Sequence, residues 1–149
     1  MSTYSFLDVS ASITGPGGAF ALGYGEAVAK EGIKIAMAGD KNTMTIGADG
    51  EGMHSLHADK SGQVTLRYLK TAPINAKLMA LYDAQTISSS LHGQNVITVR
   101  NTASGDITTA RKCAFKKKPD LTYAEDGDIV EWVFDSIKID TLLGTYSGT

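Results

Sequence analysis

Two of the three histidines lie close enough in the sequence to share a metal ion. His54 and His57 are three residues apart, a spacing that brings both side chains to one face of a helix and suits zinc. The segment around them is polar and contains glycines, so it reads as loop or strand, and we expect exposed histidines without a metal. Three nearby carboxylates lack the ligand spacing and the final glutamate of a calcium-binding EF-hand loop: Asp49, Glu51 and Asp59.

The single cysteine is the next candidate for chemistry, as a nucleophile. Cys113 alternates with Phe115 on the apolar-leaning face of a predicted strand, so we expect a small, buried core residue. Nucleophilic catalysis also needs a positioned base, and no Gly-x-Ser-x-Gly elbow is present. The glycine clusters at 15–18 and 23–25 match neither dinucleotide-binding nor phosphate-binding loops and read as turns. These patterns predict neither an enzyme nor a bound cofactor.

One basic cluster in the last third of the chain could contact phosphate groups. Its members are Arg111, Lys112, Lys116, Lys117 and Lys118. Successive residues of a strand point to opposite faces, so these side chains cannot all form one patch. The formal net charge of -2 also lacks the basic excess of a dedicated DNA-binding protein. We therefore expect the cluster at a solvated strand end or at a contact with an acidic partner.

The composition is that of one globular domain. A length of 149 residues is enough to bury a core, and no linker composition divides the chain, so we predict a single domain over residues 1–149. No apolar run approaches the roughly 18 residues of a membrane-spanning segment. The first residues lack the pattern of a signal peptide, and one cysteine cannot make an internal disulfide. Both features predict synthesis and folding in a reducing cytoplasm.

Most of the chain alternates between apolar and polar residues, which is the period of half-buried strands. The first predicted strand has Leu7, Val9, Ala11 and Ile13 on one side and Asp8, Ser10, Ser12 and Thr14 on the other. Further strands are predicted at 19–22, 33–37, 44–46 and 63–68. Short strands separated by glycine-containing turns are typical of an antiparallel sandwich or barrel.

Two segments depart from this alternation. Residues 47–60 are polar with sparse apolar side chains, so we expect a long loop or a projecting hairpin there. Over about residues 73–90 the apolar period changes to roughly 3.6 residues, beginning at Pro73, which fits the first turn of a helix. The stripe contains Ile74, Leu78, Leu81 or Tyr82, Ile87 and Leu91. The serines at 88–90 have poor helix propensity, so we expect the end of this helix to fray.

The last third of the chain returns to strands. Residues 96–99 are apolar on both faces, as expected of a strand that is covered on both sides. Two sets of residues are predicted to share a strand face: Ile107, Thr109, Arg111, Cys113 and Phe115, and then Val130, Trp132 and Phe134. Beyond Ser136 the apolar phase switches to Ile137 and Ile139, which predicts a bulge or a strand that joins another surface. The predicted fold is therefore mainly β, an antiparallel sandwich or barrel with one flanking α-helix.

Three segments together resemble one known family. They are Tyr-Ser-Phe-Leu-Asp-Val at 4–9 with Gly-Pro-Gly-Gly at 15–18, Leu-Lys-Thr-Ala-Pro-Ile-Asn-Ala-Lys-Leu-Met at 69–79, and the stretch from Cys-Ala-Phe-Lys-Lys-Lys-Pro-Asp at 113–120 to Trp-Val-Phe-Asp at 132–135. In their order and spacing they are similar to the tail tube proteins of contractile-tailed bacteriophages. The resemblance spans nearly the whole chain, and it implies a structural, self-assembling protein of the virion.

The resemblance also implies an architecture and a set of partners. Six copies would form a ring, rings would stack into a tube inside a sheath, and DNA would pass through the channel. The partners would be other copies of the chain, the tail sheath, the baseplate and the tail terminator. Two groups of polar residues are then candidates for the channel wall: Asp8, Ser10, Ser12 and Thr14, and Glu131 and Asp135. An acidic or neutral wall would repel phosphate groups, so we expect the basic cluster outside the channel or at subunit contacts.

Contacts between rings would then come from the predicted loop at 47–60. Its candidate residues are Asp49, Glu51, Met53, His54, Leu56 and His57. A glycine-rich projection that carries apolar side chains has little reason to stay solvated in a monomer.

Other functions stay open from the sequence alone. The tube of a contractile injection or secretion machine shares the implied architecture and differs in what passes through it. A monomeric β-sandwich that binds carbohydrate would fit the fold class, with Trp132 or Tyr68 as a stacking platform, although the alternation places Trp132 in the core. An enzyme would need a site assembled from residues that are distant in the sequence.

Overall fold

The computed structural model describes residues 4–5, 8–22, 28–127 and 129–145. Its elements are β1 (Val9–Gly15), β2 (Gly18–Ala21), β3 (Val28–Met37), β4 (Asn42–Ile46), β5 (Gly52–Leu56), β6 (Gly62–Leu69), α1 (Ile74–Gln85), β7 (Asn95–Asn101), β8 (Asp106–Phe115) and β9 (Ile129–Leu142). Leu7 and the predicted turn at 23–25 lie outside the described residues. The fold is mostly antiparallel β with one short helix, as predicted.

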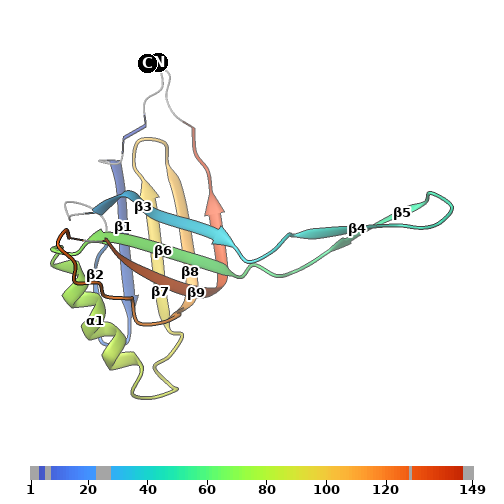
Figure 1. Ribbon diagram of the computed structural model, residues 1–149. Helices are drawn as coiled ribbons and strands as arrows, with labels where there is room; N and C mark the ends of the chain where they lie inside the picture. Colours follow the sequence, from blue (N-terminus) through green and yellow to red (C-terminus); the bar gives the residue numbers. More distant parts are fainter. Residues whose placement is uncertain (1–3, 6–7, 23–27, 128, 146–149) are drawn as a thin grey trace.

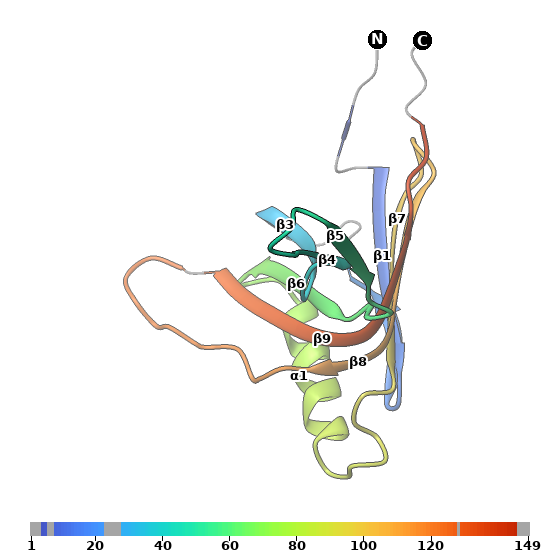
Figure 2. The same cartoon turned by 90° about the vertical axis from the view of Figure 1, so that its right-hand side faces the viewer.

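One seven-stranded sheet forms the body, in the order β2-β1-β7-β8-β9-β6-β3. Every neighbouring pair in it is antiparallel. The long strands β8 and β9 bend sharply, so β7, β1 and β2 form one half of the sheet and β6 and β3 form the other (Figure 2). The core lies inside this bend.

The bend coincides with an irregularity on both long strands. Arg111 pairs with Lys138, and Cys113 pairs with Ser136. Lys112 and Ile137 lie between these two pairs and form no pair of their own. Lys112 has a φ of 53°, a backbone conformation that non-glycine residues rarely adopt. The predicted switch of apolar phase beyond Ser136 is confirmed for Ile139, which is buried, but it is wrong for Ile137, which is 65% exposed.

The predicted face of β8 is wrong for its first half. Thr108 and Ala110 are buried before the bulge, and Cys113 and Phe115 are buried after it. The prediction had joined Ile107, Thr109 and Arg111 to Cys113 and Phe115 by strict alternation. An extra residue at the bulge reverses the phase, so strict alternation cannot run through it.

The helix α1 packs into the bend of the sheet (Figure 1). Its buried side chains are Ile74, Leu78, Leu81 and Gln85. The helix ends at Gln85, before the predicted limit near residue 90, and Ile87 is 82% exposed. The Thr86 N–H still donates to the Tyr82 carbonyl at 3.1 Å, but the following serines favour turns over helix.

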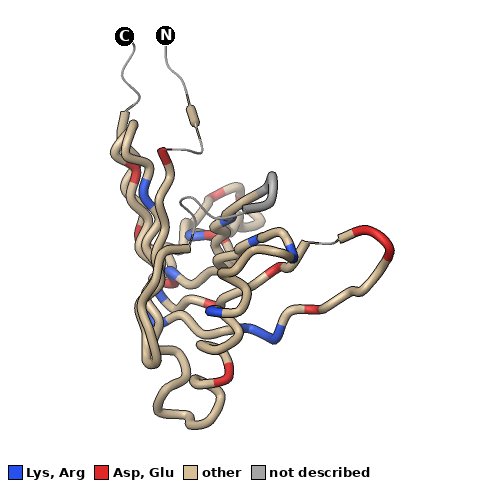
Figure 3. The backbone as a smooth tube through the Cα atoms, turned by 90° about the vertical axis from the view of Figure 1, so that its left-hand side faces the viewer, with Lys and Arg blue, Asp and Glu red and all other residues tan. Residues whose placement is uncertain are grey.

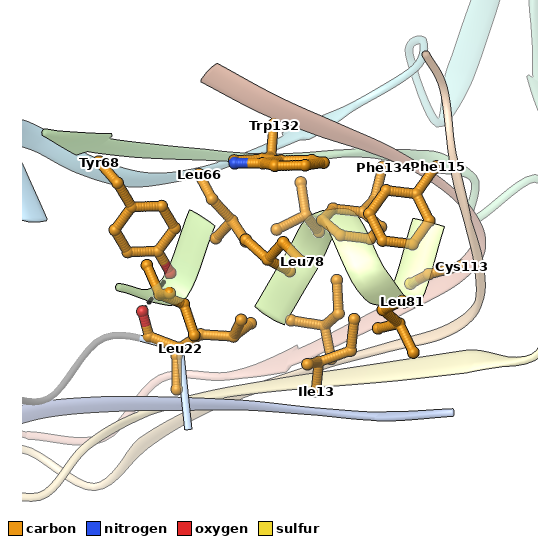
Figure 4. Close-up of a cluster of buried hydrophobic side chains, with 14 of the residues drawn as sticks. Ile13, Leu22, Leu66, Tyr68, Leu78, Leu81, Cys113, Phe115, Trp132 and Phe134 are labelled. Carbon is orange, nitrogen blue, oxygen red and sulfur yellow. Dashed lines mark hydrogen bonds between the residues drawn. The ribbon is translucent and has the colours of Figure 1, made fainter. Parts of the chain in front are cut away.

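Aromatic side chains fill the space between α1 and the sheet (Figure 4). Phe115 lies at the centre of this cluster, with ring centroids 5.5 Å from Tyr82, 5.9 Å from Trp132 and 4.5 Å from Phe134. The indole N–H of Trp132 donates to Asn75 Oδ1 at 3.1 Å, so the buried polar tip of this side chain has a partner. The cluster joins the helix to both long strands of the sheet.

A buried polar pair closes the C-terminal end of α1. Gln85 and Asn95 exchange two hydrogen bonds through their side-chain amides, each 2.6 Å long. Gln85 Nε2 also donates to the Pro16 carbonyl at 3.1 Å, and Asn95 Nδ2 donates to the Cys113 carbonyl at 3.1 Å. Buried amides are costly without partners, so these bonds fix α1 against the β1–β2 turn and β8.

A two-stranded hairpin of β4 and β5 projects from the body (Figure 1). We call residues 38–60 the arm. Its turn and β5 fall in the segment predicted as a loop or projecting hairpin at 47–60, and β4 supplies its other strand. The alternation of Met44 and Ile46 had indicated a half-buried strand, but both side chains are exposed, because no described part of the chain covers β4.

Candidate assembly surfaces

The arm has one apolar face. In its register Asn42 pairs with Leu56 and Met44 pairs with His54, so Met44, Ile46 and Leu56 point to the same side. These three side chains are 63%, 56% and 80% exposed. Met53 lies on the opposite face, opposite Thr45. The predicted contact residues included Met53 and Leu56 but not Met44 and Ile46. The alternation of Met44 and Ile46 was the only sequence pattern that indicated this apolar face.

The tip of the arm is a tight, acidic turn. The Gly47 N–H donates to the Glu51 carbonyl at 2.7 Å, and the Glu51 N–H donates to Asp49 Oδ1 at 3.1 Å. Gly50 has a φ of 86°, which favours glycine at this position. The side-chain carboxylate of Glu51 has no ion-pair partner among the described residues. The tip therefore presents two carboxylates at the end of an apolar strand pair.

The two histidines of the arm form no metal site with their neighbours. His54 lies in β5, and His57 Nε2 is 3.3 Å from the Thr43 hydroxyl. Within the described ranges, no group of three or more potential ligands comes together. The arm is better explained as a contact surface than as a metal centre.

The base of the arm is fixed to β9. The Ile139 N–H donates to the Lys60 carbonyl at 2.9 Å. The Lys60 ammonium is 3.0 Å from Asp140 Oδ1, and Arg111 is 2.9 Å from the other oxygen of the same carboxylate. The hydrogen bond from Lys60 is the main cause that lowers the pKa of Asp140. These contacts give the arm a defined direction relative to the sheet.

The two predicted sets of channel residues lie on different halves of the sheet. Asp8, Ser10, Ser12 and Thr14 occupy or flank β1, whose core-facing residues are Val9, Ala11 and Ile13. Glu131 and Asp135 occupy β9, on the face opposite Trp132 and Phe134. Both sets point away from the core, but the bend separates them, so one chain does not bring them together.

Each set has polar or basic neighbours on its own half of the sheet. Ser10 and Ser12 share a shallow pocket with Arg100. Glu131 is 2.7 Å from Arg67, and Asp135 Oδ1 accepts a hydrogen bond from Gln63 at 3.1 Å. The outward face of the β3–β6–β9 half is therefore close to charge balance.

The basic cluster is divided among four surroundings. Arg111 pairs with Asp140 at the base of the arm, and Lys117 is 3.6 Å from Asp120. Lys112 and Lys116 line a groove, and Lys118 is exposed. Figure 3 shows the loop between β8 and β9 with basic residues at its start and acidic residues further along.

The groove has a volume of about 860 Å³ and lies beside the base of the arm. Ala38, Asp59 and Ser61 line it from the arm and its root, and Asp135 and Ile137 line it from β9. Asp59 Oδ1 accepts the Ser61 N–H at 2.8 Å, and Ser61 is the main cause that lowers the pKa of Asp59. We call this surface the root groove. No sequence pattern indicated this groove, because the irregularity at Lys112 was not predicted.

Residues considered for other functions are in the core. Cys113 is buried as predicted, and burial raises the pKa of its thiol, which makes it a poor nucleophile. Trp132 and Tyr68 are also buried, so neither offers a platform for a sugar ring. In the described part of the chain, no helix has the length and apolar character needed to cross a membrane.

Both ends of the sheet are open strands in the described part of the chain. There, β2 and β3 each pair on one side only, so the body presents two unpaired edges. Open edges invite pairing with another chain unless something covers them.

Comparison with known families gives one match that covers nearly the whole chain. A family described as "Bacteriophage PhiTE tail tube protein" matches residues 1–144. Among curated proteins, none matches the sequence.

Solved structures share the fold at low sequence identity. A chain of the PVC sheath-tube complex of an extracellular contractile injection system, in the extended state, is 13% identical with a TM-score of 0.58, covering 95% of this chain and 92% of that chain. A chain of the PVC sheath/tube terminator is 10% identical with a TM-score of 0.61, covering 94% and 96%. A chain of the anti-feeding prophage cap is 7% identical with a TM-score of 0.54, covering 95% and 93%.

Proposed function

The chain belongs to the tail tube protein family of bacteriophage PhiTE, and from this premise we propose that it forms the inner tube of a contractile phage tail. Copies close into hexameric rings, the rings stack, and the channel conducts DNA into the host. The family is structural, and the protein acts by assembly and passive conduction instead of catalysis.

The single observation that carries this proposal is the projecting arm with its exposed apolar face. Burying the side chains of Met44, Ile46 and Leu56 contributes about 1.5–3 kcal/mol each when water is excluded. A monomer forgoes this stabilisation, because the described residues of one copy leave all three side chains more than half exposed. A second copy that covers the arm recovers it, so the arm favours stacking of one ring on the next.

Closure of each ring follows from the two open edges of the sheet. β2 and β3 are different strands, so a contact between them on neighbouring copies is heterologous, and such contacts form a ring when the rotation closes. Ring closure also removes both exposed edges. This arrangement is compatible with a continuous inner wall built from several chains.

We assign the channel wall to the half of the sheet that carries the arm. The arm continues β3 and β6, so stacking through it extends the wall formed by β3, β6 and β9 from ring to ring. Glu131 and Asp135 then face the channel, and Ser10, Ser12 and Thr14 with Asp8 face away from it. On this wall the charge of Arg67 offsets the charge of Glu131. DNA phosphates therefore meet no cluster of cations, and the release of counterions that drives DNA binding is not favoured there.

The same assignment leaves the basic cluster outside the channel or at subunit contacts. A density map of the assembled tube tests this point directly. We expect Glu131 at the wall and most of the cluster from Arg111 to Lys118 away from it. A map with most of that cluster on the wall contradicts the assignment.

The proposed partners follow from this role: a tail sheath, a baseplate, a tail terminator and other copies of the chain, all within the virion. The similar chains come from a sheath-tube complex, a terminator and a cap, which supports contacts of these kinds.

The second candidate is the tube of a contractile injection machine that carries no DNA. The observation that favours it is the fold shared with chains of an extracellular contractile injection system. The two functions differ in the genes nearby, because a phage tail requires a capsid and a head-to-tail connector.

Removal of the arm tests the assembly function. Replacing residues 41–57 with two glycines keeps Lys60 and the hydrogen bond from the Ala38 N–H to the Ser61 carbonyl, so the body keeps its hairpin. We expect a folded protein by circular dichroism that forms no long tubes in negative-stain electron microscopy across a concentration series. Thr43→Ser with Thr45→Ser, on the opposite face of β4, is the control and should leave tube formation unchanged. Tubes of normal length without the arm would refute the proposed role of the arm.

A further inference from the structure

Three of the four methionines in the described residues lie on the arm or on the strand that leads into it. Met37 ends β3, Met44 lies in β4 and Met53 lies in β5. Their side chains are 50%, 63% and 60% exposed, whereas Met79 of α1 is half-buried against the core. In a single copy the thioethers of the arm are therefore open to solvent, and the thioether of the helix is shielded.

The two methionines of the arm itself point to opposite faces. Met44 lies on the apolar face with Ile46 and Leu56, whereas Met53 lies opposite Thr45 on the other face. Both sulfur atoms can be reached from solvent to a similar extent. A chemical change at Met44 therefore alters the apolar face, and the same change at Met53 leaves that face intact.

An exposed thioether reacts with hydrogen peroxide without help from a catalytic group. A sulfur lone pair attacks one peroxide oxygen, an S–O bond forms, the O–O bond breaks, and the other oxygen leaves as water. The sulfur is oxidised by two electrons and the peroxide is reduced by two. The product, methionine sulfoxide, is polar where methionine is apolar.

A sulfoxide on the apolar face opposes the burial of that face. Its oxygen accepts hydrogen bonds from water while the arm is exposed. Covering the face removes this water, and the neighbouring side chains of Ile46 and Leu56 offer no donor in its place. Oxidation of Met44 therefore weakens any contact that covers the face, although the arm and the body stay folded.

We propose that Met44 is an oxidation site that controls assembly, because its conversion to the sulfoxide by hydrogen peroxide keeps a free subunit out of the tube. Methionine sulfoxide reductases reverse the change: two thiols become a disulfide and the sulfoxide oxygen leaves as water. The inference rests on the proposed tube function, since it needs a face that assembly covers. In a finished tube the same sulfur is covered, so the sensitivity belongs to subunits before assembly.

Peroxide treatment of dilute subunits tests the site. Peptide mass spectrometry locates the added oxygen, and sedimentation after concentration measures the assembled fraction. We expect oxidation to lower the assembled fraction of the wild type at least about tenfold, because an unpaired polar atom is buried. Met44→Leu should assemble equally well with and without peroxide. Met53→Leu is the matched control on the opposite face and should remain as sensitive as the wild type.

Reversal supplies a second readout. Methionine sulfoxide reductases of both stereospecificities, with dithiothreitol, should restore assembly of the oxidised wild type, and circular dichroism should be unchanged throughout. Assembly that persists with Met44 fully oxidised overturns the assignment and leaves the tube function standing. The same holds if Met44→Leu is as sensitive to peroxide as the wild type. Untreated protein that never assembles overturns both the assignment and the tube function.

Discussion

At the scale of single residues, Gly15 is a position that leaves no room for a side chain. A Cβ there would lie 1.9 Å from Asn95 Oδ1 and 3.1 Å from Gln85 Nε2. Gly15→Ala must therefore displace the buried amide pair and leave its donors unsatisfied, which we expect to lower the free energy of unfolding by about 1–3 kcal/mol. Urea unfolding measures this change. Gly127→Ala, where nothing lies within 4 Å, is the matched control, and an equal loss in both variants would contradict the explanation.

Single residues also show where prediction from sequence fails. Burial of Cys113 and Phe115 follows from alternation, and the structure confirms it. The bulge at Lys112 does not follow, because Thr108 and Ala110 are small and a lysine carries no mark of a positive φ. The register shift lies in the pairing of β8 with β7, where Asn95 faces Cys113 and Ile97 faces Ala110, so that Arg111 and Lys112 stand against one residue. The root groove depends on that bulge, so the groove could not be predicted from the sequence either.

At the scale of elements, the predicted apolar stripe of the helix contains residues that α1 buries and one residue that lies exposed beyond its end. Leu78 is fully buried against the sheet, whereas Ile87 lies beyond the helix end and is exposed. Leu78→Ala should lower the free energy of unfolding by about 2–5 kcal/mol through a cavity. Ile87→Ala should change it by less than about 0.5 kcal/mol. Thermal or urea unfolding distinguishes the two variants. Comparable losses of unfolding free energy in both would mean that the helix continues to residue 90 and packs there.

The arm shows what an amphipathic pattern leaves undetermined. The alternation of Met44 and Ile46 predicts a strand with one apolar face, and β4 is such a strand. Alternation cannot tell whether the cover for that face comes from the same chain or another one. β1 and β6 have the same pattern, and their apolar faces are buried within the chain. The difference arises from the arm's place between β3 and β6, which the local sequence does not encode.

At the scale of the whole molecule, two kinds of surface remain uncovered in one copy: the open edges of β2 and β3, and the arm with its groove. The resemblance of three sequence segments was enough to predict the family, which the match over residues 1–144 confirms. Ring number and channel orientation depend on contacts between copies, and no pattern within one chain specifies them. The arm continues along β3, whereas pairing at an open edge adds a strand beside it, so the proposed assembly uses the edges for closure and the arm for stacking.

The arm also sets a length for the assembly. If the extended arm joins one ring to the next, successive layers are separated by about the length of one arm, which is about 30–40 Å at about 3.3 Å per residue. Power spectra of tube images in electron microscopy measure this layer spacing. A repeat well below about 25 Å would be too short for an extended arm between one ring and the next. It would show that the arm lies across the ring, against a neighbour in the same layer, instead of joining two layers.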